Sequence, residues 1–164
     1  GAKVIANYSS NEAAADQFKQ ENAQCADRLD LQKFNVASYE EVEKFYRYVE
    51  EKHGSIDVLV SNAGVGAHED VPVWDLPLND WRWCMAVNVW GIIHGIKAFV
   101  PGMLAHGEEG HVMHTSSGNG GLILVPTTPI YTTTKTTAHA FLKGKLCFYL
   151  KFFFYSFFII PFSI

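Results

Sequence analysis

Short apolar segments rich in β-branched residues alternate with longer amphipathic segments along the first 142 residues, and this alternation constrains the fold more than any other feature. It predicts strands at residues 4–8, 31–36, 56–60 and 111–115, and helices at 12–22, 38–54, 80–104 and 130–142. Strands and helices that alternate at this spacing form right-handed βαβ units, so a parallel sheet covered by helices is expected. Ligands of such sheets bind beyond the carboxyl ends of the strands.

The predicted helix at 38–54 carries the clearest local signals. Ser38 and Glu41 are three residues apart, as in a capping box, and Gly54 follows the last residues of the helical pattern. Apolar residues recur at i, i+3, i+4 and i+7, namely Val42, Phe45, Tyr46 and Val49. The pattern predicts an amphipathic helix with one buried face.

Composition excludes several classes of protein. The chain has 164 residues, of which 48% are apolar and 18% charged, so it can bury a core and is not expected to be disordered. Its formal charge is −4 and its basic residues form no long stripe, which argues against a nucleic-acid partner. Three scattered cysteines fit neither a disulfide framework nor a metal site, and the chain opens without a signal-peptide pattern. We therefore expect a cytoplasmic protein without a metal.

The end of the chain, residues 143–164, differs from the rest. It contains no acidic residue, three lysines and seven of the twelve phenylalanines. Residues 146–160 include Lys151 and are fewer than the roughly 20 apolar residues that a membrane-spanning helix needs. Membrane association is therefore not expected. We treat residues 1–142 as the informative domain and 143–164 as a hydrophobic, phenylalanine-rich tail that does not belong to it.

Tyr131 and Lys135 form the most distinctive pair of polar residues. They are four apart in the helix predicted at 130–142, so both side chains project from the same face. A phenol has an ordinary pKa of about 10 and is a poor base at neutral pH, but a neighbouring ammonium favours the phenolate and makes a tyrosine a usable acid or base. Such pairs also arise by chance, so this interpretation depends on the surrounding motifs.

Four motifs occur in a characteristic order: Asn62-Ala63-Gly64, Asn88-Val89-Trp90-Gly91, Thr115-Ser116-Ser117-Gly118 and Tyr131-Thr132-Thr133-Thr134-Lys135. In order and spacing they resemble the classical short-chain dehydrogenase/reductase (SDR) family, over residues 1–141. The resemblance implies an α/β fold with a Rossmann-like, doubly wound parallel sheet. It also implies an NAD(P)-dependent oxidoreductase that transfers hydride between nicotinamide and a secondary alcohol or ketone. Residues 1–142 would then be a partial Rossmann-type catalytic domain.

The resemblance implies roles for individual residues. Tyr131 would exchange a proton with the substrate oxygen, and Lys135 would lower the pKa of that tyrosine and bind the nicotinamide ribose. Ser117, or its neighbour Ser116, would orient the substrate oxygen. Asn88 would hold a water molecule that links Lys135 to solvent. The motif Asn62-Ala63-Gly64 would pack against the adenine-ribose side of the cofactor.

Cofactor choice depends on the residues after the first predicted strand. Many NAD-dependent family members carry an aspartate there, whereas this chain has Tyr8 and Ser9 and no carboxylate to repel a 2′-phosphate. NADP is therefore preferred to NAD. Asn35 and Val36 stand where the family has residues that lie near the adenine.

The sequence also departs from the family pattern. The first βα unit, with its glycine-rich dinucleotide turn, and the C-terminal strands are not found in the chain, so weak cofactor binding is expected. The activity is therefore expected of the parent protein, and the alternative interpretation is a catalytically inactive truncated fragment or a remnant that binds a partner. The homodimers and homotetramers usual in the family are in doubt for the same reason. His111 and His114 do not suggest a metal site, because residues three apart on a strand lie on opposite faces.

Overall fold

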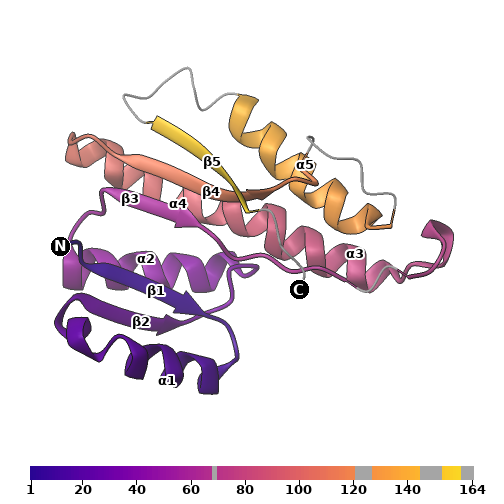
Figure 1. The fold of residues 1–164 in the computed structure, drawn as a ribbon. Coiled ribbons are helices and arrows are strands. Elements are labelled where there is room, and N and C mark those ends of the chain that lie inside the picture. Colours follow the sequence, from indigo (N-terminus) through magenta and orange to yellow (C-terminus); the bar gives the residue numbers. More distant parts are fainter. Residues whose placement is uncertain (68–69, 121–126, 145–152, 160–164) are drawn as a thin grey trace.

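The computed structural model describes residues 1–67, 70–120, 127–144 and 153–159. Five strands and five α-helices follow one another along this part of the chain (Figure 1). In order, the elements are β1 (Val4–Tyr8), α1 (Glu12–Glu21), η1 (Ala23–Arg28), β2 (Leu29–Lys33), α2 (Tyr39–His53), β3 (Val58–Ser61), η2 (Val73–Asp75), α3 (Leu78–Met85), η3 (Ala86–Trp90), α4 (Gly91–His106), β4 (His111–Ser117), α5 (Pro129–Gly144) and β5 (Phe153–Ile159).

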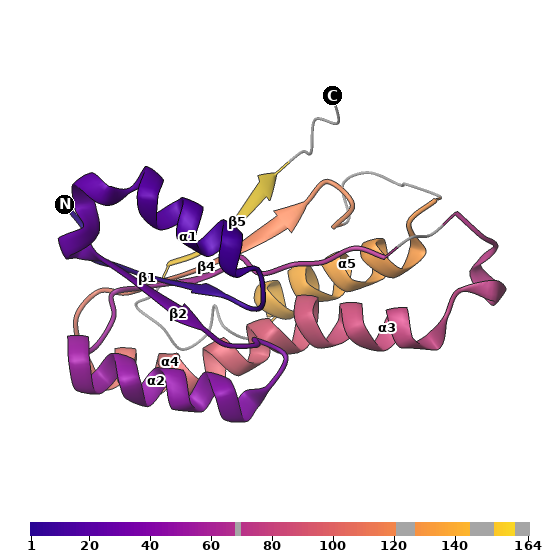
Figure 2. The ribbon, with the colours of Figure 1, turned by 90° about the horizontal axis from the view of Figure 1, so that it is seen from below.

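The strands form two parallel sheets. One contains β1 and β2 and the other has the order β3-β4-β5, with Val58 opposite His111 and His111 opposite Phe153. Figure 2 shows α1 on one side of the strands and α2, α4 and α5 on the other. Helices on both faces of parallel strands define the Rossmann-like, doubly wound α/β class expected from the sequence.

Most of the predicted elements are confirmed. The helix at 38–54 is α2, in which Ser38 Oγ accepts from the Glu41 amide and Gly54 ends the helix with a φ of 80°. That φ lies in the left-handed region, which glycine adopts without strain. The helix predicted at 80–104 is longer than expected, and a π-helical turn, η3, separates its two α-helical parts.

The tail requires a correction. The sequence pattern predicts no strand of the sheet after residue 142, but β5 pairs in parallel with all seven residues of β4. Two physical reasons account for this pairing. Phenylalanine, tyrosine and isoleucine, which make up most of Phe153–Ile159, favour strands, and the free edge of β4 offers unpaired backbone groups to an adjacent segment.

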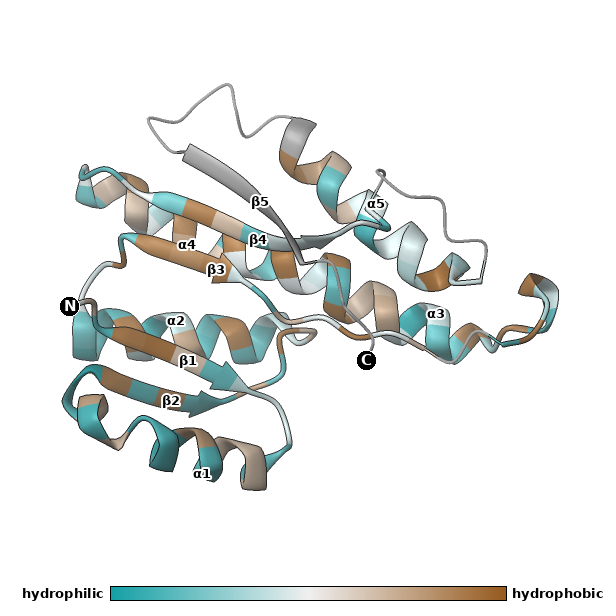
Figure 3. Cartoon of the chain, in the orientation of Figure 1, coloured by the Kyte–Doolittle hydropathy of each residue, from teal (hydrophilic) through white to brown (hydrophobic). Residues whose placement is uncertain are grey.

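One hydrophobic cluster of the described residues joins the two sheets through α2 and α4. Its buried residues include Val42 and Val49 of α2 and Phe99 and Met103 of α4, with Val112 of β4. Partly buried residues from both sheets pack against it, including Ile5 of β1 and Leu59 of β3. Figure 3 shows the corresponding apolar colouring on β1 and β3 and along α4. Among the described residues β1 and β3 are not paired, so this cluster connects the two sheets.

The helical run from Leu78 to His106 is 29 residues long and apolar enough, by length and composition, to cross a membrane. Ile92, Phe99 and Met103 of this run are buried in the core, whereas Leu78, Trp83, Trp90 and Leu104 are exposed.

A polar network fixes the C-terminal end of α2. Asp30 of β2 accepts hydrogen bonds from Tyr48, at 2.7 Å, and from Lys52, at 3.0 Å, and His53 Nε2 lies 2.7 Å from the same carboxylate oxygen. Burial alone raises the pKa of Asp30, but the hydrogen bonds from Tyr48, Gln32, His53 and Lys52 outweigh it and hold this pKa well below its ordinary value. The network therefore ties the end of α2 to the start of β2.

We predict that Phe99→Ala lowers the free energy of unfolding by about 3–5 kcal/mol, because it opens a cavity in the cluster that joins the two sheets. The ring of Phe99 packs against Phe45 and Tyr46, with centroids 5.6 and 5.2 Å away. Urea unfolding measures the effect. Trp74→Ala is the control, because Trp74 is 81% exposed and its removal should cost within about 0.5 kcal/mol. Losses of equal size at the two positions would contradict the prediction.

Candidate active site

The candidate active site lies at the carboxyl ends of the strands. Parallel strands end at one edge of a sheet, so Ser9 follows β1, Asn35 follows β2, Asn62 follows β3 and Ser117 ends β4 at that edge. Asn88, Tyr131 and Lys135 come from the helices packed beside it.

Asn88 lies in the π-helical turn and is buried. The backbone N–H of Gly91 bonds to the carbonyl of Ala86, five residues earlier, so the helix is wider at this point. The Asn88 side chain accepts from the Val65 amide and donates to the Val65 carbonyl, both at 2.8 Å. The π turn therefore directs this amide into the loop that follows β3.

Tyr131 and Lys135 lie in α5, and Lys135 Nζ is 5.6 Å from the centroid of the Tyr131 ring. Lys135 is buried, and its Nζ donates to the Thr115 carbonyl at 3.0 Å. Burial lowers the pKa of Lys135. An amine beside a phenol in a sheltered position is an arrangement suited to proton transfer.

Two glycines leave space for this pair. A Cβ at Gly64 would lie 3.3 Å from Lys135 Nζ and 3.5 Å from Asn88 Oδ1. A Cβ at Gly66 would lie 3.8 Å from Cδ2 of the Tyr131 ring. The loop after β3 therefore approaches Lys135 and Tyr131 closely. Its two glycines leave space beside them that a side chain would fill. The family resemblance places Gly64 only on the adenine-ribose side of the cofactor, and the contacts of both glycines with this pair could not be predicted from it.

Thr115 of β4 links Asn62, at the end of β3, to Lys135. Thr115 Oγ1 donates to Asn62 Oδ1 at 2.7 Å, and the Thr115 carbonyl accepts from Lys135. Sequence reasoning did not assign roles to Val65, Thr115 or Thr134. Their contacts use backbone groups or follow from tertiary packing, for which the sequence carries no signal.

The two candidate serines occupy different positions. Alternation along β4 places Ser116 on the same side as His114, toward the helices, and Ser117 at the strand end on the other side. Both are buried, and Ser117 Oγ accepts from the Asn119 amide at 3.3 Å.

The residues expected near the adenine lie at the same edge of the strands, farther from Tyr131 and Lys135. Asn35 Oδ1 accepts from the Ala37 amide, and its backbone N–H donates to Glu41, so Asn35 is held in the turn before α2. Val36 packs against α4, because a Cβ at Gly91 would lie 3.0 Å from Val36 Cγ2. The Tyr8 carbonyl accepts from the Phe34 amide, and Ser9 is exposed. Ala63, in the loop after β3, is also exposed.

His114 lies beneath the pair and faces the helices, whereas His111 faces the other side of β4, as strand alternation predicts. The His114 side chain is buried, and neither ring nitrogen has a hydrogen-bond partner among the described residues. Burial, followed by the positive charges of Lys135 and His139, lowers the pKa of His114 to about 4. His114 is therefore neutral at neutral pH and adds no second positive charge beside Lys135.

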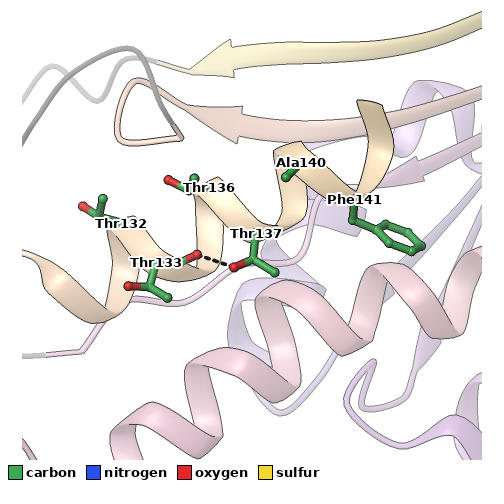
Figure 4. Close-up of a pocket in the computed structure, with 6 residues that line it drawn as sticks. All are labelled: Thr132, Thr133, Thr136, Thr137, Ala140 and Phe141. Carbon is green, nitrogen blue, oxygen red and sulfur yellow. Dashed lines mark hydrogen bonds between the residues drawn. The ribbon is translucent and has the colours of Figure 1, made fainter. Parts of the chain in front are cut away.

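A separate pocket of about 600 Å³ lies on the opposite face of α5. Figure 4 shows it lined by Thr132, Thr133, Thr136, Thr137, Ala140 and Phe141. None of these side chains is titratable near neutral pH, and helical periodicity turns them away from Thr134 and Lys135. We therefore do not assign the chemistry to this pocket.

Comparisons with known proteins identify the family of the chain. Residues 1–147 match the family model of the short chain dehydrogenases, and the chain therefore belongs to this family. A 3beta-hydroxysteroid dehydrogenase from Eggerthella lenta is 30% identical over 110 residues, which are 67% of this chain and 42% of that protein. The matched part thus spans less than half the length of that relative.

Solved structures show the same fold. A gluconate 5-dehydrogenase from Burkholderia cenocepacia, in complex with NADP and tartrate, is 28% identical with a TM-score of 0.76, covering 88% of this chain and 55% of that one. A short-chain dehydrogenase/reductase from Burkholderia phymatum, in complex with NAD, has a TM-score of 0.82 at 21% identity and covers 97% of this chain and 66% of that one.

We predict that His114 makes the protein less stable as the pH falls from about 6.5 to 4. The folded-state pKa of His114 is lowered to about 4, so the unfolded state binds more protons in this window and folding stability declines with acid. The contribution is at most about 1.4 kcal/mol per pH unit. Urea unfolding of the wild type and His114→Leu across this range measures it, with exposed His106→Gln as the control. Equal pH slopes for the wild type and His114→Leu would refute the prediction.

Proposed function

We propose that this chain is the catalytic part of an NAD(P)-dependent oxidoreductase that interconverts a secondary alcohol and a ketone. The observation that carries the proposal is the position of Lys135 beside Tyr131, with both held against the glycine loop after β3. The names of the matched relatives, among them a 3beta-hydroxysteroid dehydrogenase, support a small hydroxyl or carbonyl compound as the substrate. We assign the activity to residues 1–142.

The residues at the strand ends fit a nicotinamide nucleotide. Gly64 and Gly66 form a cradle that a Cβ would narrow, directly beside Lys135 and Tyr131. Asn62, Ala63 and Gly64 would lie along the adenosine side, with Asn35 and Val36 nearer the adenine and Tyr8 and Ser9 near the ribose. When bound, the nucleotide supplies the hydride to the carbonyl carbon or accepts it in the reverse direction.

The protein's own side chains handle the proton. In reduction, Tyr131 donates its phenolic proton to the carbonyl oxygen, which becomes the hydroxyl of the alcohol, and in oxidation it takes that proton back. The ammonium of Lys135 stabilises the negative charge left on the Tyr131 oxygen. Ser117 donates a hydrogen bond to the same substrate oxygen and so orients it. After reduction the phenolate of Tyr131 regains a proton from the ammonium of Lys135, and Asn88 would hold the water from which Lys135 takes a proton in turn.

NADP is the preferred cofactor in this proposal. Tyr8 ends β1 and Ser9 follows it, and neither side chain carries a carboxylate. Nothing on this segment therefore repels a 2′-phosphate. We further propose a cytoplasmic location.

One observation favours a second candidate. Among the described residues β1 and β3 are unpaired with each other, and Val58 and Val60 of β3 are 46% and 54% exposed. An interrupted sheet of this kind is compatible with a catalytically inactive fragment, or with a remnant that binds a partner.

We predict that Tyr131→Phe lowers ketone turnover by about a hundredfold or more, because it removes the proton donor. Turnover is followed by nicotinamide absorbance over a panel of ketones, and nucleotide binding by tryptophan fluorescence. Binding should persist in Tyr131→Phe. The control is Tyr39→Phe, because Tyr39 lies at the start of α2. Undiminished turnover in Tyr131→Phe would refute the assignment, and a folded wild-type chain without turnover would favour the second candidate.

We predict that NADPH binds more tightly than NADH and that Ser9→Asp weakens NADPH binding by about tenfold or more, since a carboxylate beside a 2′-phosphate is strongly repulsive. The affinity for NADH should fall less or rise. Fluorescence titration gives both dissociation constants. Ser55→Asp, between α2 and β3 at the other edge of the strands, is a control with the same charge change. Equal losses for the two nucleotides would contradict the proposed cofactor preference.

A further inference from the structure

Thr134 lies in α5 between the two catalytic candidates, and its side chain is completely buried. Its hydroxyl is used twice. Oγ1 donates to the Tyr131 carbonyl at 2.9 Å and accepts from Asn88 Nδ2 at 2.9 Å. The direction of the hydroxyl is therefore fixed at both ends.

These two bonds extend a longer chain of contacts. Asn88 is itself held by the Val65 backbone through a donor and an acceptor, both at 2.8 Å. The loop after β3, the π turn η3 and the first turns of α5 are thus linked in the order Val65, Asn88, Thr134 and Tyr131. The link ends on the backbone of the residue that carries the proposed proton donor.

The two hydrogen bonds at position 134 require a hydroxyl group. Valine has nearly the same shape as threonine but can neither accept from Asn88 nor donate to Tyr131. Because the site is buried, water cannot easily replace the lost partner, and an unsatisfied Asn88 N–H would be costly. Serine keeps the hydroxyl and so can keep both bonds.

We propose that Thr134 is a positioning residue for the reaction: through Asn88 it sets the place of Tyr131 and Lys135 relative to the glycine loop at 64–66. It is not a catalytic residue, because its hydroxyl bonds to a backbone carbonyl and to Asn88. The inference rests on the proposed function, since it concerns the geometry of the same proton-transfer pair.

The test compares the wild type with Thr134→Val, Thr134→Ser and Thr137→Val. Thr137 is the matched control because its hydroxyl also donates back along α5, to the Thr133 carbonyl at 2.7 Å, but does not form the bond to Asn88 (Figure 4). The first readout is independent of turnover. It is the chemical shift and hydrogen exchange of the Asn88 side-chain amide by NMR, assigned with Asn88→Asp.

We expect Thr134→Val to shift the Asn88 amide signals and to speed their exchange by about tenfold, the factor that corresponds to about 1.4 kcal/mol of lost protection. Thr134→Ser and Thr137→Val should keep the wild-type signals. In turnover, Thr134→Val should lower kcat by about tenfold to a hundredfold, in line with small misplacements of catalytic groups, with little change in KM for the ketone. Its kcat should also depend differently on pH, and Thr134→Ser should restore the wild-type profile.

A purely structural role would lower the unfolding free energy and leave kcat and its pH profile unchanged in the folded protein, and that result would overturn the proposal. Unchanged Asn88 signals in Thr134→Val would also overturn it, as would a serine variant as impaired as the valine variant. If no form turns over a ketone, the failure belongs to the proposed function, and the Asn88 amide still decides whether the Thr134 link exists.

Discussion

The packing of α2 against α4 is the interaction on which the rest of the structure depends. Among the described residues the two parallel sheets share no strand pairing across β1 and β3, so hydrogen bonds within the sheets cannot hold them in register. Apolar side chains from both sheets pack against the buried residues of α2 and α4. Among these residues, Phe99 is at the centre of an aromatic group. Burial of this shared surface brings all the strand ends to one edge.

Helix α4 also connects the core to the chemistry. Its C-terminal half is buried in the shared cluster, whereas the π turn just before its start carries Asn88. A regular α-helix at this point would rotate the following residues and direct the amide differently. The extra residue in the turn allows Asn88 to bind the Val65 backbone while the helix continues into the core. The position of the site therefore depends on the same helix that stabilises the fold.

Much of the fold could be predicted from the sequence because local signals agreed with burial. Ser38, Glu41 and Gly54 mark α2 at both ends, and Val4–Tyr8 is a strand in both the sequence pattern and the structure. The strand β5 could not be predicted in the same way. Its aromatic composition favours a strand, but pairing with β4 depends on a free edge that exists only in the folded sheet.

The sequence by itself determined the order of strands and helices and the pairing of Tyr131 with Lys135, because helical periodicity places residues four apart on one face. It also determined membership of the short-chain dehydrogenase family, through motifs whose order and spacing are readable along the chain. Only the tertiary structure decided which groups meet this pair. The Val65 backbone, Thr115 and Thr134 reach Asn88 and Lys135 from separate segments, and such contacts depend on how the helices pack on the strands. Periodicity describes one element at a time, and it carries no information about that packing.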